Sequence, residues 1–455
     1  MVEKADWMAE ALDLGRQRSQ GEVELYLLRE RSLHIKVFEG KVDSLDVAEY
    51  QGLGLRVIRE GRCGTSYTER LEREAIEEAI RGAIENSTIS PADPFQGLEG
   101  ADPSLGQIPP LELLDEEIAQ QGEQKKIDLA LALEQTARDF DPKIVNVPYA
   151  SYYEAFREVR LMNSRGREGA YARGGAGLAI ETMAQAGDQV KSCYQSQYAL
   201  HFGDLDAKEL ARKTAEEGIR RLGASELDSA SYPVVLLNEV TRGLLATFSS
   251  SFSARNVQKG LSLLAGRMGE AVARPELTLR DDALLPGGYA SRPFDDEGTP
   301  SRQLDLIRQG TLSGYLYNGY AARKDGVVST GHAARGSVKS AVEIAPSNLY
   351  LVPGEKSLEE LLSAAGSGVL IVDVEGLHSG ANPISGDFSL GAQGYRFDAG
   401  GTKRPVHNFT VAGNFYQLLK EIVEIGRDLE FSPPMGGTAV GCPSLLVSRM
   451  ALSGK

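Results

Sequence analysis

Residues 232–243, YPVVLLNEVTRG, place one carboxylate where an apolar run gives way to a predicted helix. With histidine at positions 238 and 243 the segment would read H-E-x-x-x-H, in which two imidazoles hold a zinc ion and the glutamate accepts a proton from zinc-bound water. Asn238 is instead a weak ligand, and Gly243 has no side chain. Positions 238 and 243 would also lie roughly 140° apart around an ideal helix. These residues alone favour a buried strand leading into a helix, with Glu239 as a polar residue of the first turn.

The other residues that bind metals or act as nucleophiles are scattered. No two of the five histidines stand four positions apart, and each is predicted to be exposed or hydrogen-bonded: His34, His201, His332, His378 and His407. The three cysteines lie too far apart for a C-x-x-C zinc spacing or a dense disulfide framework: Cys63, Cys193 and Cys442. His378 and Ser379 are adjacent, and adjacent side chains on a strand point to opposite faces, which argues against a serine nucleophile with a histidine base.

A glycine-rich run at residues 376–394, GLHSGANPISGDFSLGAQG, offers a second kind of site. Small residues allow another main chain to approach closely, and such a strand edge can capture an extended peptide. The candidate peptide-binding residues are Gly376, His378, Ser379, Gly380 and Gly386. Turns between the strands of a β-rich domain explain the same residues equally well.

The bulk composition excludes several classes of partner. A net charge of −15, from 64 acidic and 49 basic residues, repels a phosphate backbone, so the sequence argues against nucleic acid as a direct partner. A mean hydropathy of −0.25 and the lack of an apolar run of membrane-spanning length predict no membrane association. Residues 1–20 carry charges throughout, which is not typical of a secretory signal, and the expected location is cytoplasmic.

The pattern of apolar residues predicts an α+β fold in which two helix-covered antiparallel-sheet units precede a β-rich C-terminal domain. The first unit, residues 1–110, has a helix over 5–18, alternating strands over 23–67 with turns at Glu39-Gly40 and Glu60-Gly61, a helix over 71–85 and a proline-rich surface linker. The second unit, residues 111–228, repeats helix, strands and helix, and the last helix begins with a capping box at Asp206 and Glu209. Residues 229–455 form the predicted β-rich domain, which carries the degenerate metal-site segment.

Three separated segments, in this order along the chain, resemble the TldD/PmbA family: residues 52–70, 291–333 and 378–397. In that family, TldD-type members carry H-E-x-x-x-H and a C-terminal cysteine ligand and hold a catalytic zinc, whereas PmbA (TldE)-type members lack the motif. Asn238 and Gly243 depart from the TldD pattern, and Cys442, which precedes Pro443, lacks the context of the third ligand. The resemblance is therefore to the PmbA (TldE)-type branch.

The resemblance implies a non-metal-binding subunit of an intracellular metallopeptidase that acts on peptides or unfolded segments. The expected partner is a TldD-type paralogue in a heterodimer, and a homodimer is possible in its absence. No cofactor is expected in this chain, zinc is expected in the partner, and Glu239 keeps only the vestigial position of the catalytic base. The alternative is a homo-oligomeric peptide-binding or scaffold protein without hydrolase activity.

Overall fold

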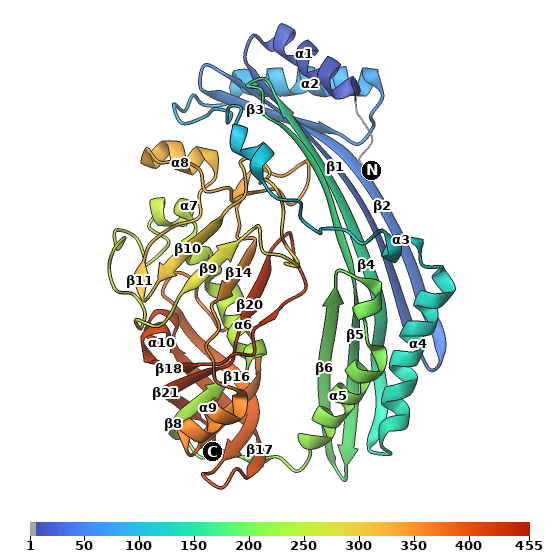
Figure 1. The fold of residues 1–455 in the computed structure, drawn as a ribbon, viewed down its shortest axis with the longest axis vertical. Coiled ribbons are helices and arrows are strands. Elements are labelled where there is room, and N and C mark those ends of the chain that lie inside the picture. Colours follow the sequence, from blue (N-terminus) through green and yellow to red (C-terminus); the bar gives the residue numbers. More distant parts are fainter. Residues whose placement is uncertain (1–5) are drawn as a thin grey trace.

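The first half of the chain builds one long antiparallel sheet. The computed structural model describes residues 6–455 (Figure 1), so the start of the predicted first helix, residue 5, lies outside the described residues. The sheet has the strand order β3-β2-β1-β4-β5-β6. Its strands are β1 (Glu22–Phe38), β2 (Lys41–Arg59), β3 (Arg62–Thr68), β4 (Ile144–Asn163), β5 (Glu168–Ala186) and β6 (Gln189–Ala199). The two predicted units are joined into one sheet because β1 pairs with β4, from Glu24↔Asn163 to Val37↔Ala150.

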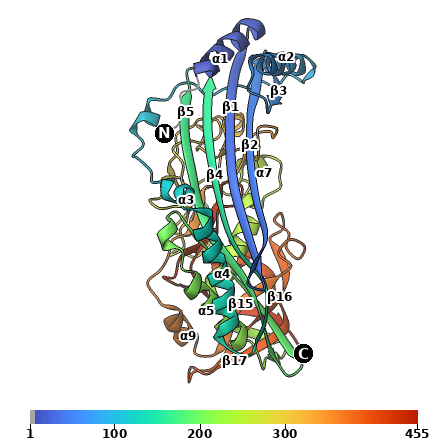
Figure 2. The same cartoon turned by 90° about the vertical axis from the view of Figure 1, so that its right-hand side faces the viewer.

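Two pairs of helices cover one face of this sheet at its two ends. Figure 2 looks onto that face, with α1 (Asp6–Ser19) and α2 (Arg73–Ile89) across one end and α4 (Glu123–Phe140) and α5 (Ala207–Arg220) across the other. Side chains along a strand alternate between its two faces, so the odd-numbered apolar residues of β1 all lie on the face that the helices cover. Leu25 and Leu27 pack against α1 and α2, and Leu33, Ile35 and Val37 pack against α4 and α5. The predicted turns hold positive φ angles at Glu39, Gly40, Glu60 and Gly61.

The proline-rich segment after α2 is packed against the C-terminal half of the chain rather than free. It contains the 3₁₀ turn η1 (Pro103–Gln107) and α3 (Glu116–Gln120). On α8 (Gly319–Asp325), Arg323 donates to the carbonyls of Phe95 and Gly97, each at 2.8 Å, and the Tyr320 hydroxyl donates to Asp93. Further along, the amide of Gly174 in β5 donates to the carbonyl of Leu113 at 2.9 Å. The segment therefore ties the sheet to the C-terminal domain.

The C-terminal half is β-rich, as predicted, and contains two larger sheets with one shared core. The mixed seven-stranded sheet has the order β18-β21-β8-β15-β16-β17-β7, and the six-stranded sheet has the order β11-β10-β9-β14-β20-β19. The strands of the first are β7 (Ser225–Glu226), β8 (Ala230–Leu236), β15 (Gly368–Glu375), β16 (Asp387–Phe397), β17 (Lys403–Asn414), β18 (Ile422–Ile425) and β21 (Leu445–Ser453). Those of the second are β9 (Leu279–Asp282), β10 (Gln303–Arg308), β11 (Thr311–Leu312), β14 (Asn348–Leu351), β19 (Glu430–Phe431) and β20 (Ala439–Cys442).

Short elements complete this half of the chain. A small ladder joins β12 (Ala333–Ala334) to β13 (Glu343–Ile344). Besides α8, the helices are α6 (Asn238–Phe248), α7 (Ala254–Gln258), α9 (Leu358–Ala365) and α10 (Phe415–Glu421), with the 3₁₀ turn η3 (Ser249–Phe252). The 3₁₀ turn η2 (Phe202–Asp204) belongs to the first half of the chain, between β6 and α5. Helix α6 places Val240, Leu244, Leu245 and Phe248 in the core that both sheets share. The α+β class predicted from the sequence is confirmed.

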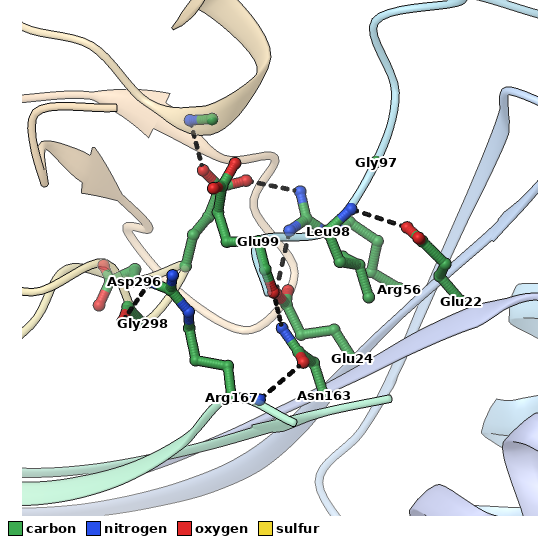
Figure 3. Close-up of polar contacts among 12 residues, drawn as sticks. Glu22, Glu24, Arg56, Gly97, Leu98, Glu99, Asn163, Arg167, Asp296 and Gly298 are labelled. Atoms are coloured by element: carbon green, nitrogen blue, oxygen red, sulfur yellow. Dashed lines mark hydrogen bonds and ion pairs between the residues drawn. The ribbon is translucent and has the colours of Figure 1, made fainter. Parts of the chain in front are cut away.

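The C-terminal domain lies along the sheet face that α1, α2, α4 and α5 leave open (Figure 1). Where the two parts meet, buried charged residues of β1 and β2 pair with the loop that contains Asp296 and Glu297 (Figure 3). The Arg56 guanidinium bridges Glu24 and Glu297, at 2.9 Å to each carboxylate. Arg335 pairs with the other oxygen of Glu24, and Tyr26 donates to Asp296 at 2.9 Å. This network fixes the relative position of the two parts.

Candidate functional site

The candidate site begins where the buried strand β8 ends and α6 starts. Leu237 continues the strand ladder, since its amide donates to the carbonyl of Ile371 at 3.0 Å, and the chain then turns into the helix. Glu239, in the first turn, keeps 42% of its side chain exposed. Burial raises the pKa of Glu239; Arg242, 3.7 Å away, opposes the shift, and the carboxylates of Glu430 and Asp373 add to it. The predicted strand-to-helix junction with an acidic first turn is confirmed.

Asn238 occupies the first degenerate ligand position. The residue is buried, and it forms hydrogen bonds with neighbouring residues. Its side-chain amide donates to the carbonyl of Asp428 at 3.2 Å, and its backbone amide donates to the hydroxyl of Ser444 at 3.1 Å. Ser444 in turn donates to the carboxylate of Asp428 at 2.6 Å, and the Thr241 hydroxyl donates to the carbonyls of Asn238 and Pro443, each at 2.9 Å. The amide of Asn238 therefore anchors the helix start to the loop before β21.

Gly243, the second ligand position, is covered by another side chain. A Cβ atom at position 243 would lie 2.9 Å from a terminal carbon of Leu377, a distance that side chains essentially never adopt. Cys442, the only cysteine in the C-terminal domain, lies in β20 beside Leu279 and Leu351 on the wall of an apolar cavity. Burial raises the pKa of the Cys442 thiol to about 12, so the sulfur is a neutral thiol among these apolar side chains.

These residues do not fit a catalytic zinc ion. Such an ion takes three protein ligands, usually imidazole, thiolate or carboxylate, and keeps an open position for water. Helix α6 offers one carboxylate, one hydrogen-bonded amide and a glycine. Among residues 6–455 no group of three or more histidine, cysteine, aspartate or glutamate side chains is placed to hold a metal ion. Glu239 can accept a proton here, and the cation beside it is Arg242 at 3.7 Å.

The glycine-rich run forms the loop between β15 and β16, residues 376–386, and the first part of β16, and Leu377 of the loop meets Gly243 of α6. Gly376 and Gly386 adopt positive φ angles of 86° and 82°, which the turns at the two ends of the loop require. A Cβ atom on Gly380 would lie 2.3 Å from the carbonyl oxygen of Ser389, which belongs to the same hairpin. The loop itself thus accounts for these glycines, while His378 and Ser379 are exposed. Their role in peptide binding stays a prediction.

A cluster of tyrosines from β4, β6 and the C-terminal domain, where the long sheet meets that domain, was not foreseen from the sequence. We call it the tyrosine platform; its members are Tyr149, Tyr153, Tyr194, Tyr198 and Tyr289. The rings of Tyr153 and Tyr198 stack with centroids 6.5 Å apart, and Tyr289 meets Tyr198 edge-on at 4.8 Å. Burial raises the pKa of Tyr198 to about 12. On β5, Gly175 and Gly177 make room for the platform, because a Cβ atom on either would collide with the Tyr198 or Tyr153 side chain.

The tyrosine platform and the first turn of α6 border the same interdomain region. Tyr289 donates from its hydroxyl to the carbonyl of Tyr198 at 2.9 Å, which joins the C-terminal domain to β6. Burial raises the pKa of Tyr289, the carboxylate of Glu430 adds to the shift and Arg242 opposes it. Arg242 also lies 3.7 Å from Glu239 and 4.0 Å from Glu430. An aromatic surface beside an acidic helix start can hold a peptide, since aromatic rings bind apolar side chains and their hydroxyls bind polar groups.

Sequence models of one protein family match most of the chain. The PmbA/TldA metallopeptidase domain 1 matches residues 23–87, the central domain matches residues 116–222 and the C-terminal domain matches residues 229–454. The metalloprotease PmbA of Escherichia coli O157:H7 is 26% identical over 447 residues, which cover 98% of this chain and 95% of that protein.

Solved structures agree over nearly the full length. The crystal structure of a proposed modulator of a DNA gyrase from Thermotoga maritima is 31% identical, with a TM-score of 0.90 and coverage of 98% of this chain and 99% of that one. TldE from Thermococcus kodakarensis has a TM-score of 0.90 at 22% identity, with coverage of 98% and 100%, and therefore supports the fold alone. The chain belongs to the PmbA/TldD metallopeptidase family.

Proposed function

We propose that this chain is the non-metal-binding subunit of a TldD/TldE-type cytoplasmic metallopeptidase that acts on peptides or unfolded segments. The proposal rests on the contacts of the two degenerate ligand positions on α6, Asn238 and Gly243. Leu377 covers Gly243, and the amide of Asn238 is bonded to the carbonyl of Asp428. A helix that binds a metal through these two positions needs ligand side chains free to reach the ion, and neither Asn238 nor Gly243 offers one.

The chemistry of peptide hydrolysis explains why a second subunit is required. The reaction needs an activated water and a group that stabilises the developing oxyanion. Glu239 with its raised pKa can accept a proton, but Arg242 is its nearest cation and is shared with Glu430. A TldD-type partner with an intact H-E-x-x-x-H motif supplies zinc for both tasks. In this proposal the present chain contributes substrate contacts, with the tyrosine platform as the surface that holds the peptide.

The test compares this chain, a TldD-type partner and their mixture on an unfolded peptide. We expect turnover only in the mixture, loss of turnover after treatment with a chelator, and no turnover when the motif glutamate of the partner is replaced by glutamine. Metal analysis of this chain alone is expected to show far less than one zinc per molecule. Turnover by this chain alone that resists the chelator would overturn the proposal. Peptide binding without turnover in any mixture would instead support a homo-oligomeric binding or scaffold protein.

A further inference from the structure

Glu181 on β5 is a carboxylate without a partner. Most glutamates in the strands of the long sheet form ion pairs with arginine or lysine: Glu22, Glu24, Glu30, Glu49, Glu154 and Glu158. Glu168, where β5 begins, is exposed to solvent. Glu181 is only partly exposed, and its carboxylate has neither a hydrogen bond nor an ion pair within residues 6–455. A carboxylate drawn partly out of water without a counter-charge is unfavourable, so Glu181 gains from a cation that a ligand supplies.

Two tyrosines of the platform stand directly opposite Glu181, one on each neighbouring strand. Glu181 pairs in register with Tyr149 of β4 on one side and with Tyr194 of β6 on the other. Residues that are directly opposite in a sheet point to the same face, with Cβ atoms about 4.5–5.5 Å apart. This face is the one that α4 and α5 leave open, because the adjacent Ile180 packs against those helices on the other face. Burial raises the pKa of Tyr194, and the neighbouring Tyr149 hydroxyl and the Glu181 carboxylate add to the shift.

The tips of two further rings lie over β5 on the same face. A Cβ atom on Gly177 would lie 2.4 Å from the hydroxyl oxygen of Tyr153, and one on Gly175 would lie 2.3 Å from that of Tyr198. One face of β5 is therefore lined by tyrosine hydroxyls that lead to the Glu181 carboxylate. Ammonium and guanidinium groups have hydrogen-bond donors and no acceptor, so an array of oxygens suits them, and aromatic ring faces attract their charge.

This group of residues can be reached from the edge of the sheet. Strand β6 is the last in the order β3-β2-β1-β4-β5-β6, so no strand of this sheet covers its outer side. Tyr194 is 57% exposed, and its neighbours on the same face of β6, Ser192 and Ser196, are exposed as well. Glu181 thus lies one strand in from an open edge. A side chain of a peptide that lies on the platform can reach Glu181 across β6.

Basic side chains on the neighbouring strands are directed to other groups. Lys36 of β1 donates to Asp43 at 2.8 Å, and the Lys191 ammonium of β6 lies 3.1 Å from Nδ1 of His407 in the C-terminal domain. Neither lysine forms an ion pair with Glu181. The chain as a whole carries a net charge of −15, which adds a long-range attraction for a basic peptide. The charge around Glu181 therefore favours a cationic ligand.

We propose that Glu181, Tyr149 and Tyr194 form a subsite of the tyrosine platform that binds a basic side chain, lysine or arginine, of an extended peptide. The carboxylate supplies the counter-charge, and the two tyrosines supply ring faces and hydroxyl oxygens. The subsite deepens the proposed function and rests on it, because it assumes that the platform holds a peptide. It predicts that peptides with one basic residue are preferred over neutral or acidic ones.

The test measures binding of three fluorescently labelled pentapeptides to the purified chain by anisotropy at low salt. Each peptide is Ala-Leu-X-Leu-Ala with both ends capped, so that the side chain X carries the only charge. X is lysine, norleucine or glutamate, and norleucine provides a chain of similar length to lysine without its charge. For the native chain we expect the lysine peptide to bind about fivefold tighter than the norleucine peptide, and the glutamate peptide to bind most weakly.

Substitutions show where the preference arises. Glu181→Gln is expected to bring the lysine and norleucine peptides within about twofold of each other. Glu168→Gln removes the same charge from an exposed position of the same strand and is expected to keep the native ratio. Tyr194→Phe keeps the ring and is expected to keep most of the preference, whereas Tyr194→Leu is expected to reduce it about twofold. Circular dichroism checks that each variant is folded.

The possible results separate the subsite from the proposed function. Equal binding of the lysine and norleucine peptides by the native chain, or an unchanged ratio in Glu181→Gln, overturns the subsite and leaves the proposed function standing. If none of the three peptides binds, either to the chain alone or to its mixture with a TldD-type partner, the subsite is overturned and the result also counts against the proposed function.

Discussion

Replacing Arg56 with methionine removes the cation that joins the sheet to the C-terminal domain. The side chains of Glu24 and Glu297 are 1% and 2% exposed, and Arg56 lies 2.9 Å from each. Glu24 keeps Arg335, and Glu297 keeps the amide of Gly319 at 2.8 Å, but the Glu297 oxygen that faced Arg56 loses its partner. Breaking a buried ion pair costs about 3–5 kcal/mol, because a buried charge is left uncompensated. We expect Arg56→Met to lower the free energy of unfolding by about that amount at pH 7.

The pH dependence of this loss follows from Glu297. Burial alone would raise the pKa of Glu297, but Arg56, the Gly319 amide and Arg335 together hold it below its usual range. A carboxyl whose folded pKa is depressed contributes stability above its unfolded pKa and loses it as the pH falls through the folded pKa. Without Arg56, burial dominates and the folded pKa of Glu297 rises, so protonation relieves the penalty in acid. The difference between native chain and variant is therefore expected to shrink from pH 7 toward pH 4.5.

Urea titrations at several pH values, followed by circular dichroism and by tryptophan fluorescence, measure this difference. The exposed Arg404→Met on β17 is the matched control and is expected to change stability by less than about 0.5 kcal/mol. Adding Glu297→Gln to Arg56→Met removes the uncompensated charge and is expected to recover part of the loss. A loss below about 1 kcal/mol for Arg56→Met, or a loss that does not change with pH, would refute the reasoning.

Two further predictions concern α6. Gly243→Ala is expected to change the free energy of unfolding by less than about 1 kcal/mol, because the end of the half-buried Leu377 side chain must move to admit the methyl group while alanine favours the helix, whereas in a Leu377→Ala background the same change is expected to stabilise the chain by up to about 1 kcal/mol. An equal change in the free energy of unfolding in both backgrounds would show that Leu377 does not oppose a side chain at position 243. The double variant Asn238→His, Gly243→His is expected to purify with far less than one zinc per chain by mass spectrometry, since a third ligand and the bonds that orient imidazoles are missing. One tightly bound zinc per chain at native stability would contradict this.

Local sequence patterns predicted the elements of the sheet but not how its two halves join. The alternation over residues 23–67 and the turns at Gly40 and Gly61 specify β1, β2 and β3, because short turns fix the register of neighbouring strands. No turn links β1 to β4, which are separated by β2, β3, three α-helices and a long segment. Their register depends on side-chain packing between distant residues, for which a single sequence carries no local signal.

The same limit applies to the site. The junction at Glu239 was predictable because an apolar strand and an acidic first turn are adjacent in sequence. The tyrosine platform was not, because Tyr153, Tyr198 and Tyr289 come from three distant segments, and each tyrosine alone is typical of a strand or loop. Glycines at 175 and 177 were the one available sign, since glycine inside a strand often marks the close approach of another group.

The packing of α6 explains how the helix persists without metal ligands. Its apolar residues Val240, Leu244, Leu245 and Phe248 lie in the core shared by the two C-terminal sheets. Burial of four such side chains contributes several kcal/mol, roughly 1.5–3 for each. A small domain held together by a structural metal unfolds when its ligands are lost. Asn238 bonds to Asp428 at one end of the helix and Gly243 meets Leu377 further along it, so neither position supplies one of the apolar side chains that hold α6 in the core.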